Sequence, residues 1–151
     1  MPGAQQTNAR GISGNTIVGS YWDASGYAHG FLYNGSTYTT LNAPGATETN
    51  AIGIDGSNIV GTYTVALGYQ HGYLYNGSTY TTLDVPGAVY TDALGISGSN
   101  IVGTYMDASG NWHSFLATPA AVPVPAGILL FAPGLAGLAV LRQKYIGWRK
   151  S

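Results

Sequence analysis

The chain of 151 residues contains the stretch LYNGSTYTTL at residues 32–41 and repeats it without change at residues 74–83. The flanking sequence follows the same offset of 42, which also separates His29, His71 and His113. Self-similarity at a fixed period of about 40 residues is typical of repeat proteins, in which each copy is one supersecondary unit. A β-repeat domain is therefore expected over residues 1–118, with repeats 8–49 and 50–91 and a partial repeat 92–118.

The first seven residues match the end of a preceding repeat. Pro2-Gly3-Ala4 aligns with Pro44-Gly45-Ala46 at the same 42-residue offset, so the sequence begins within a repeat. It shows no charged-then-apolar leader of the kind that directs secretion. We expect the natural form to be a longer secreted repeat protein, from which this sequence derives by truncation or by a misassigned start site.

Four short strands are expected in each complete repeat, because runs rich in Ile, Val, Thr, Tyr and Phe alternate with glycine-containing clusters. In the first repeat these strands are predicted near residues 9–12, 16–22, 27–33 and 37–41. Asn34-Gly35 favours a two-residue turn with positive φ at both central positions. Asp23-Ala24-Ser25-Gly26 favours a longer hairpin loop in which the glycine takes a left-handed conformation. Each repeat is thus predicted to be a four-stranded antiparallel meander.

A meander of this size has the strand content of one β-propeller blade, and a solenoid or a sandwich is the alternative. Propellers close with about 4–8 blades, whereas this sequence supplies two complete repeats and three strands of another. The predicted fold is therefore all-β and β-propeller-like but incomplete, either open or completed by oligomerisation. A C-terminal hydrophobic helix is expected in addition.

The composition excludes several classes of site. Charged residues make up 7% of the chain and cysteine is absent, so a disulfide framework, a thiolate metal site and a cysteine nucleophile are all excluded. Arg10 is the only cationic residue before residue 120, whereas all six acidic residues lie there. Phosphate binding relies on a basic surface, so nucleic acid is not an expected partner.

The last part of the chain changes character. A proline-rich linker is expected at residues 119–125, and residues 126–141 contain no charged side chain. Sixteen helical residues reach about 24 Å, somewhat less than the ~30 Å hydrocarbon core of a bilayer. We predict a transmembrane or sorting helix over residues 126–151 with a basic, cytoplasmic end and the repeats on the other side of the membrane. The alternative is a buried helix that packs on the repeats.

The layout of this tail resembles a known class of sorting signal. Val122-Pro123-Val124-Pro125-Ala126, the Gly/Leu/Ala-rich stretch that follows and the basic residues Arg142 and Lys144 are similar to the PEP-CTERM signals, in the variant with a VPLPA-type motif. The resemblance implies recognition by a membrane protease-transpeptidase called exosortase, with removal of the tail. It also implies at least a transient inner-membrane anchor and delivery to the surface or extracellular matrix of a Gram-negative bacterium.

The repeats resemble the HAF family of bacterial extracellular repeats over residues 8–118. The named His-Ala-Phe motif corresponds here to His29-Gly30-Phe31, His71-Gly72-Tyr73 and His113-Ser114-Phe115, preceded by Gly-Ile-x-Gly and Ile-Val-Gly-Ser/Thr-Tyr segments. The family has no assigned catalytic residue, so none is transferred. The resemblance implies an exported surface protein.

The three histidines and the loop aspartates are the obvious candidates for metal binding. A histidine that recurs in every repeat is typical of a shared structural hydrogen bond, so we interpret these residues as structural and located at blade interfaces. The alternative is a metal site formed if a symmetric assembly gathers them near an axis. Asp23 and Asp107 have carboxylate oxygens, which are common calcium ligands. The second repeat has Val65 at this position and is otherwise undisturbed, which favours a turn-capping role for the two aspartates.

No enzyme motif is recognisable. The only glutamate is Glu48, in an expected turn, and the serines recur in turn contexts. A Gly-x-Ser-x-Gly elbow, a phosphate loop and a dinucleotide fingerprint are missing from the sequence. Trp22 and Trp112 are candidates for a ligand or partner face, because aromatic rings stack on sugars.

The sequence predicts a non-enzymatic, exported surface or matrix protein with a structural or adhesive role and with no cofactor. One alternative is a module that binds extracellular polysaccharide. Another is a self-assembling filament or oligomer, in which unpaired strand edges of different chains join.

Overall fold

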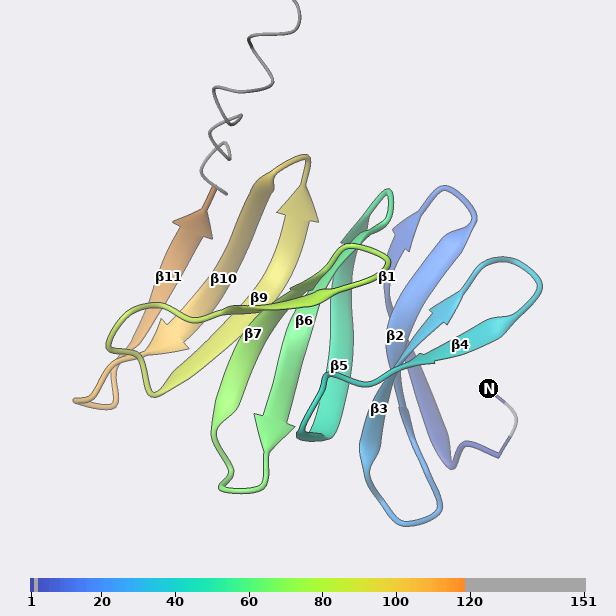
Figure 1. The fold of residues 1–151 in the computed structure, drawn as a ribbon, viewed down its shortest axis with the longest axis horizontal. Coiled ribbons are helices and arrows are strands. Elements are labelled where there is room, and N and C mark those ends of the chain that lie inside the picture. The colour runs from blue at the N-terminus through green and yellow to red at the C-terminus, as the bar shows by residue number, and fades with distance from the viewer. Residues whose placement is uncertain (2, 119–151) are drawn as a thin grey trace, which may run out of the picture. The chain divides into compact units, whose positions relative to one another are not determined.

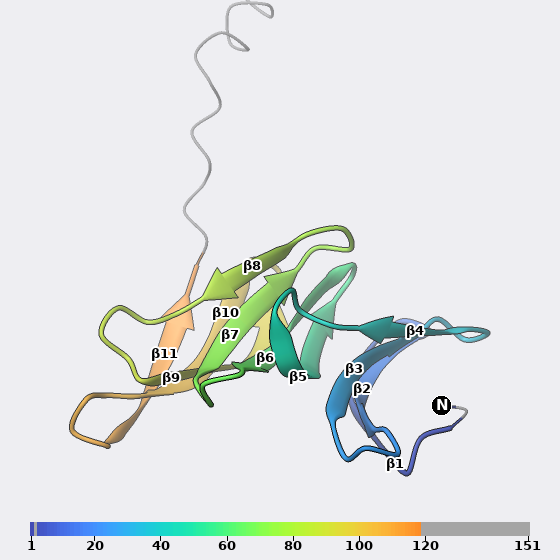
Figure 2. The same cartoon turned by 60° about the horizontal axis from the view of Figure 1, so that its bottom comes forward.

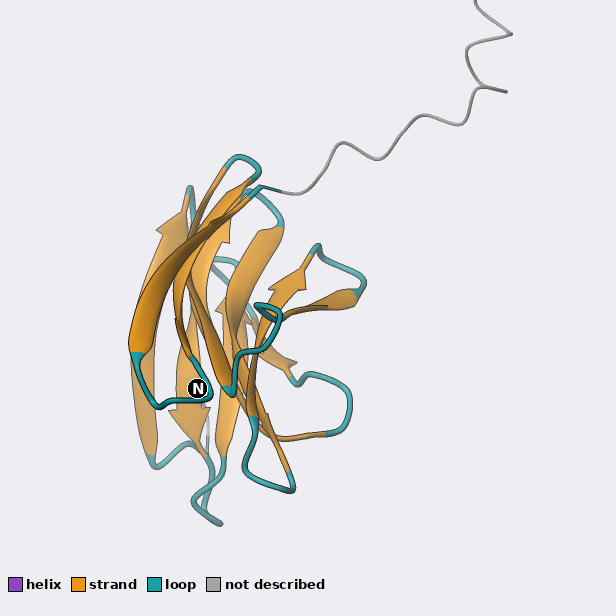
Figure 3. Ribbon diagram, turned by 90° about the vertical axis from the view of Figure 1, so that its left-hand side faces the viewer, coloured by secondary structure: helices purple, strands orange, loops and turns teal. Residues whose placement is uncertain are grey.

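The computed structural model describes residues 1 and 3–118, and this part of the chain consists of strands and connecting loops (Figures 1 and 3). The strands are β1 (Gln6–Ser13), β2 (Thr16–Trp22), β3 (Ala28–Tyr33), β4 (Tyr38–Leu41), β5 (Ala46–Asp55), β6 (Asn58–Val65), β7 (Gln70–Tyr75), β8 (Tyr80–Leu83), β9 (Tyr90–Ser97), β10 (Asn100–Met106) and β11 (Trp112–Ala117). The predicted linker 119–125 and the predicted helix 126–151 lie outside the described residues.

The strands form three separate antiparallel sheets, each from strands that follow one another in the sequence. The first sheet has the order β1-β2-β3-β4, the second β5-β6-β7-β8 and the third β9-β10-β11. Figure 2 shows the sheets side by side in sequence order. The prediction of an all-β body with four-stranded antiparallel sheets is confirmed, and none of the sheets closes on itself.

The hairpin loops follow the local chemistry of their residues. In the loop between β2 and β3, Asp23 Oδ1 accepts hydrogen bonds from the amides of Ser25 and Tyr27 at 2.8 and 3.0 Å. Gly26 has a φ of 83°, which confirms the predicted left-handed corner. The carboxylate therefore holds the loop closed while the glycine turns the chain.

The predicted two-residue turn at Asn34-Gly35 is wrong. Tyr33 pairs with Tyr38, so four residues connect the strands, and Asn34 precedes the corner instead of occupying its centre. The Asn34 side-chain oxygen accepts hydrogen bonds from the amides and hydroxyls of Ser36 and Thr37 at 2.9–3.1 Å. An asparagine side chain that captures two amides in this way stabilises a loop with Gly35 and Ser36 at its corner, where the Asn34 amide also donates to the Thr37 carbonyl at 3.2 Å and Gly35 takes a positive φ of 95°.

A glycine on the second strand of each sheet permits a bulge on the first. The β5–β6 register shifts between Ala51 and Gly53, next to the pairing of Ala51 with Gly61. A Cβ on Gly61 would overlap the carbonyl oxygen of Asn50, and Gly19 and Gly103 meet the equivalent carbonyls of their own sheets. Only a residue without a side chain allows the bulged strand to lie this close.

The sheets stack face to face, and the same apolar positions meet at both junctions. Between the first and second sheets the buried cluster consists of Val18, Leu41, Ala51, Ile54, Ile59 and Tyr73. Between the second and third sheets it is centred on Val60, Ala93 and Ile101. Val60 and Ala93 lie 42 residues after Val18 and Ala51, so the two junctions use equivalent residues.

Within the described residues, no helix is long and apolar enough to span a bilayer.

Substitution of Gly61 by alanine is expected to lower the free energy of unfolding by about 3 kcal/mol, because its methyl group would displace the Asn50 carbonyl. The control is Gly95→Ala, where the new methyl group would meet only Cγ2 of Val102, at 3.2 Å. We expect a change of less than about 1 kcal/mol there. Urea denaturation of both variants tests the difference, and equal stabilities would contradict the proposed steric role.

Tyr73 is fully buried, and its hydroxyl has no hydrogen-bond partner among the described residues. Burial raises its pKa well above the ordinary value. Because an unpartnered buried hydroxyl is costly, Tyr73→Phe is expected to raise the free energy of unfolding by about 1 kcal/mol. Tyr75→Phe is the control: it removes a hydroxyl that donates to the Gly77 carbonyl at 2.8 Å and should lower stability by about 1 kcal/mol. Thermal denaturation distinguishes the two.

Candidate functional site

Each sheet carries one histidine, packed against a tyrosine of the neighbouring strand. His29, on β3, lies against Tyr21 with ring centroids 5.1 Å apart and an interplanar angle of 30°. His71 with Tyr63, and His113 with Tyr105, repeat this arrangement at the same 5.1 Å. The pairs follow from the register, since each tyrosine is directly opposite its histidine.

Every histidine is also bonded to a carboxylate, but the carboxylate comes from a different place in the second sheet. His29 Nε2 lies 3.0 Å from Asp23 Oδ2, and His113 Nε2 lies 2.9 Å from Asp107 Oδ2. His71 Nδ1 instead lies 2.8 Å from Oδ2 of Asp84, which follows β8. In the first and third sheets the carboxylate that pairs with the histidine therefore comes from a hairpin loop. In the second sheet it comes from the residue after the last strand.

The exchange can be read from aligned positions. Asp23 and Asp107 correspond to Val65 in the second repeat, whereas Asp84 corresponds to Asn42 in the first. Asn42 keeps a polar contact, because its Oδ1 lies 3.0 Å from His29 Nδ1. The sequence analysis of single positions did not find the pairing of His71 with Asp84. When both positions are compared, the second repeat has Val65 in place of the loop aspartate and gains Asp84 in place of Asn42.

The electrostatics of the first cluster favour the charged pair. The hydrogen bond from His29, with help from the amides of Tyr27 and Ser25, holds the pKa of Asp23 below its ordinary 3.8. Partial burial lowers the pKa of His29, but the hydrogen bonds with Asp23 and Asn42 outweigh it, so the net pKa lies above 6.5. Both ring nitrogens face oxygen atoms, an arrangement that suits a doubly protonated ring.

In the third cluster, hydrogen bonds from the Asn111 backbone and from the His113 side chain lower the pKa of Asp107 to about 2. The two loop aspartates that the sequence suggested as calcium ligands are thus engaged by amides and an imidazole. Among residues 1 and 3–118, no group of three or more His, Asp or Glu side chains could hold a metal ion.

The first cluster is arranged as a structural element. In the first cluster both nitrogens of His29 are occupied, by Asp23 and Asn42, so neither is open to a substrate proton. Tyr21 Oη is bonded to Thr40 Oγ1 at 3.1 Å and ties β2 to β4. The cluster therefore holds the hairpin loop, the middle strands and the outer strand together at one end of the sheet.

The two candidate tryptophans lie on different sheets. Trp22 ends β2 of the first sheet and is partly buried, whereas Trp112 begins β11 of the third sheet and is 56% exposed. The second sheet lies between them (Figure 1). They therefore do not form one common platform.

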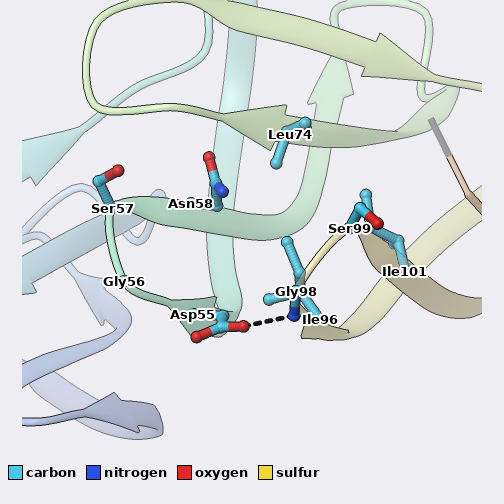
Figure 4. A pocket seen from close by; sticks show the side chains of 9 residues that line it. All are labelled: Asp55, Gly56, Ser57, Asn58, Leu74, Ile96, Gly98, Ser99 and Ile101. Carbon is cyan, nitrogen blue, oxygen red and sulfur yellow. Dashed lines mark hydrogen bonds between the residues drawn. The ribbon is translucent and has the colours of Figure 1, made fainter. Parts of the chain in front are cut away.

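A cleft of about 500 Å³ lies where the β5–β6 turn meets the β9–β10 turn. Figure 4 shows the Asp55 carboxylate directed at the Gly98 amide, with Leu74 and Ile96 on the inner side. The only acidic group in the cleft is thus used to join two sheets. A smaller cleft of about 270 Å³ beside His71 includes Asp84 and Thr91, and it also lies between the second and third sheets.

The predicted sorting residues Val122, Pro123, Val124, Pro125, Ala126, Arg142 and Lys144 lie outside the described residues.

Comparison with known proteins gave no match to a family model, to a curated protein or to a solved structure.

Replacement of Asp23 by asparagine is expected to lower the pKa of His29 toward 6.5, because the loop amides keep an acceptor while the imidazolium loses its counter-charge. A raised pKa means that the His29 contribution to stability is present below about pH 6.5 and is lost as the pH rises through the folded-state pKa. The lowered pKa of Asp23 gives a contribution that is present above pH 3.8 and lost as the pH falls through its folded-state value.

NMR titration of the His29 ring proton measures this effect directly. The matched control is Asp107→Asn, which removes the equivalent carboxylate of the third sheet and should leave the His29 titration unchanged. An unchanged His29 pKa in Asp23→Asn would show that the ion pair does not set it.

Proposed function

We propose that this chain is a non-enzymatic, exported surface or matrix protein with a structural or adhesive role, whose β-propeller-like repeats are delivered through a C-terminal sorting signal. The proposal rests on one observation: the histidine and aspartate side chains bind other parts of the same chain. The histidine–carboxylate pairs hold loops and strands together, and Asp55 joins neighbouring sheets. A body whose three histidines and whose aspartates make contacts within and between its sheets suits a structural role.

Delivery is inferred from the tail sequence. Val122-Pro123-Val124-Pro125-Ala126, the apolar stretch after it and the basic residues Arg142 and Lys144 resemble a PEP-CTERM signal. An exosortase-type enzyme is the proposed processing partner, and the membrane is the site of a transient anchor. The HAF-like repeats would then lie on the surface of a Gram-negative cell or in its matrix.

The decisive experiment is an intact-mass measurement on the protein from its native cells, separated into cytosol, membrane, periplasm and medium. A species that ends near residues 123–126 and lies outside the inner membrane is the expected result. The control is a chain with Pro123 and Pro125 both replaced by alanine, which should remain full length in the membrane fraction. A full-length, soluble, cytosolic wild-type chain would refute export.

Binding of an extracellular polysaccharide is a second candidate, favoured by half-exposed aromatic rings at the hairpin loops. Tyr27 and Tyr69 occupy equivalent positions after β2 and β6, with 53% and 50% exposure, and Trp112 lies beside the equivalent loop of the third sheet. The three loops lie at the same end of the sheets (Figure 1). Retention on polysaccharide that is lost in Tyr69→Ala but kept in Leu67→Ala would support it.

A further inference from the structure

The two junctions between sheets are two copies of one interface. One side is a valine face, made of Val18, Leu32 and Leu41 on the first sheet and of Val60, Leu74 and Leu83 on the second. The other is an alanine face, made of Ala51, Ile54, Ile59 and Tyr73 on the second sheet and of Ala93, Ile96, Ile101 and Phe115 on the third. Each pair of equivalents is 42 residues apart, so the valine face of one sheet always receives the alanine face of the next.

A polar contact accompanies the apolar faces at both junctions. The amide of Gly56, in the β5–β6 turn, donates to Ser13 Oγ of the first sheet at 3.1 Å. The amide of Gly98, in the β9–β10 turn, donates to Asp55 of the second sheet. Asp55 corresponds to Ser13, and Gly98 corresponds to Gly56. At both junctions the same turn glycine therefore donates its amide hydrogen bond to the same side-chain position of the preceding sheet.

The two outermost faces carry equivalent residues that no neighbouring sheet covers among the described residues, although Phe31, the counterpart of Tyr73, is buried beside Tyr38 of its own sheet. Val102, the counterpart of the fully buried Val18 and Val60, is 50% exposed on the third sheet, and Leu116 beside it is 66% exposed. On the first sheet Ile12 is 68% exposed, whereas its counterpart Ile54 is 9% exposed. The described part of the chain therefore ends in a valine face on one side and in an alanine face on the other.

We propose that the valine face of the third sheet binds the alanine face of the first sheet of a second copy of this chain, head to tail. In this contact Val102 and Leu116 pack on Ala9, Ile12 and Ile17 of the partner copy, as Val18 and Leu32 pack within the chain. Ser97 takes the place of Ser13 and accepts a hydrogen bond from the Gly14 amide of the second copy.

A second copy is the occupant that the internal junctions specify. The contact continues an interface that the chain already forms twice, with residues of the same type at the same offset. The two exposed terminal faces differ, because one is a valine face and the other is an alanine face. Each copy therefore offers one face of each kind to its neighbours. Unlike faces produce a heterologous contact, which closes into a ring or grows as a filament according to the rotation between copies.

The third sheet departs from the pattern at Ser114, and the departure is compatible with this contact. Its counterparts Gly30 and Gly72 are glycines because a Cβ there would lie within 2.9 Å of the Leu41 carbonyl and 2.7 Å of the Leu83 carbonyl, both on the fourth strand of the same sheet. The neighbouring sheet is farther away: Ala51 N would lie 3.5 Å from a Cβ on Gly30, which is an ordinary contact. The Cβ of Ser114 is therefore compatible with the alanine face of a second copy at the spacing of the internal junctions.

Association through faces differs from association through strand edges, because it leaves the backbone groups of the β11 edge unused. Face-to-face association specifies the surfaces through which the chain would self-assemble, and it rests on the proposed structural role. The test below uses the purified chain, so its outcome is separate from processing in cells.

The experiment measures the mass of the full chain by sedimentation in a mild detergent, for the wild type, Val102→Glu, Ile12→Glu and the control Leu67→Glu. Leu67 is 83% exposed in the loop after β6 and belongs to neither terminal face. All four proteins carry the same C-terminal segment, so association through that segment cannot distinguish them. Circular dichroism establishes that each variant is folded.

The wild type and Leu67→Glu are expected to associate, whereas each face variant should associate at least about tenfold more weakly, because a carboxylate would be buried without a partner. A mixture of Val102→Glu and Ile12→Glu should recover a pair and nothing larger, since one intact valine face meets one intact alanine face. Both variants add the same charge, so recovery cannot come from attraction between the new groups.

Three results would overturn the proposal. A monomeric wild type would show that a second copy does not cover these faces. Face variants that associate like the control would place the contact elsewhere. Folded variants that fail to recover a pair on mixing would indicate a self-complementary or edge-paired assembly instead of a head-to-tail one.

Discussion

Burial of one face of each sheet against the next is the interaction on which the rest of this structure depends. A single three- or four-stranded sheet of this composition would leave both of its apolar faces in water, and burial of apolar surface is the main contribution that favours folding. Each sheet covers an apolar face of the sheet before it: the second sheet covers Val18 and the third covers Val60. The glycines that allow bulges and the aspartates that close loops matter because they keep each sheet in the shape that its neighbour requires.

The histidine clusters show what is constant between repeats and what is free to change. The constant element is an imidazole between a tyrosine ring and a carboxylate, and the source of the carboxylate changes. Asp23 and Asp107 approach from the hairpin loop, whereas Asp84 approaches from the end of the last strand. The requirement is therefore for a charge near the ring, and the backbone position that supplies it is secondary.

Much of the body could be predicted from the sequence, because periodicity reports directly on local structure. The strand predicted at residues 16–22 matches β2, and the left-handed corner predicted at Gly26 is present. Where several local conformations compete for the same residues, prediction failed. Asn34-Gly35 suits the centre of a tight turn, but the Asn34 side chain gains more hydrogen bonds in a loop with Gly35 and Ser36 at its corner. The carboxylate exchange was missed because it involves two substitutions at separate positions, Val65 for a loop aspartate and Asp84 for Asn42, and only the fold brings both positions next to the same histidine.

The order of the strands has a consequence for how the chain acquires its structure. Every strand pairs only with a strand adjacent to it in the sequence, so the loops that must close are short and the entropy lost in closing them is small. All-β proteins are usually slow to fold because their pairings join distant segments. Here each hairpin forms from residues that leave the ribosome one after another, so a sheet is completed before the next begins. Synthesis itself can thus set the order of assembly, with each finished sheet serving as the template on which the following one condenses.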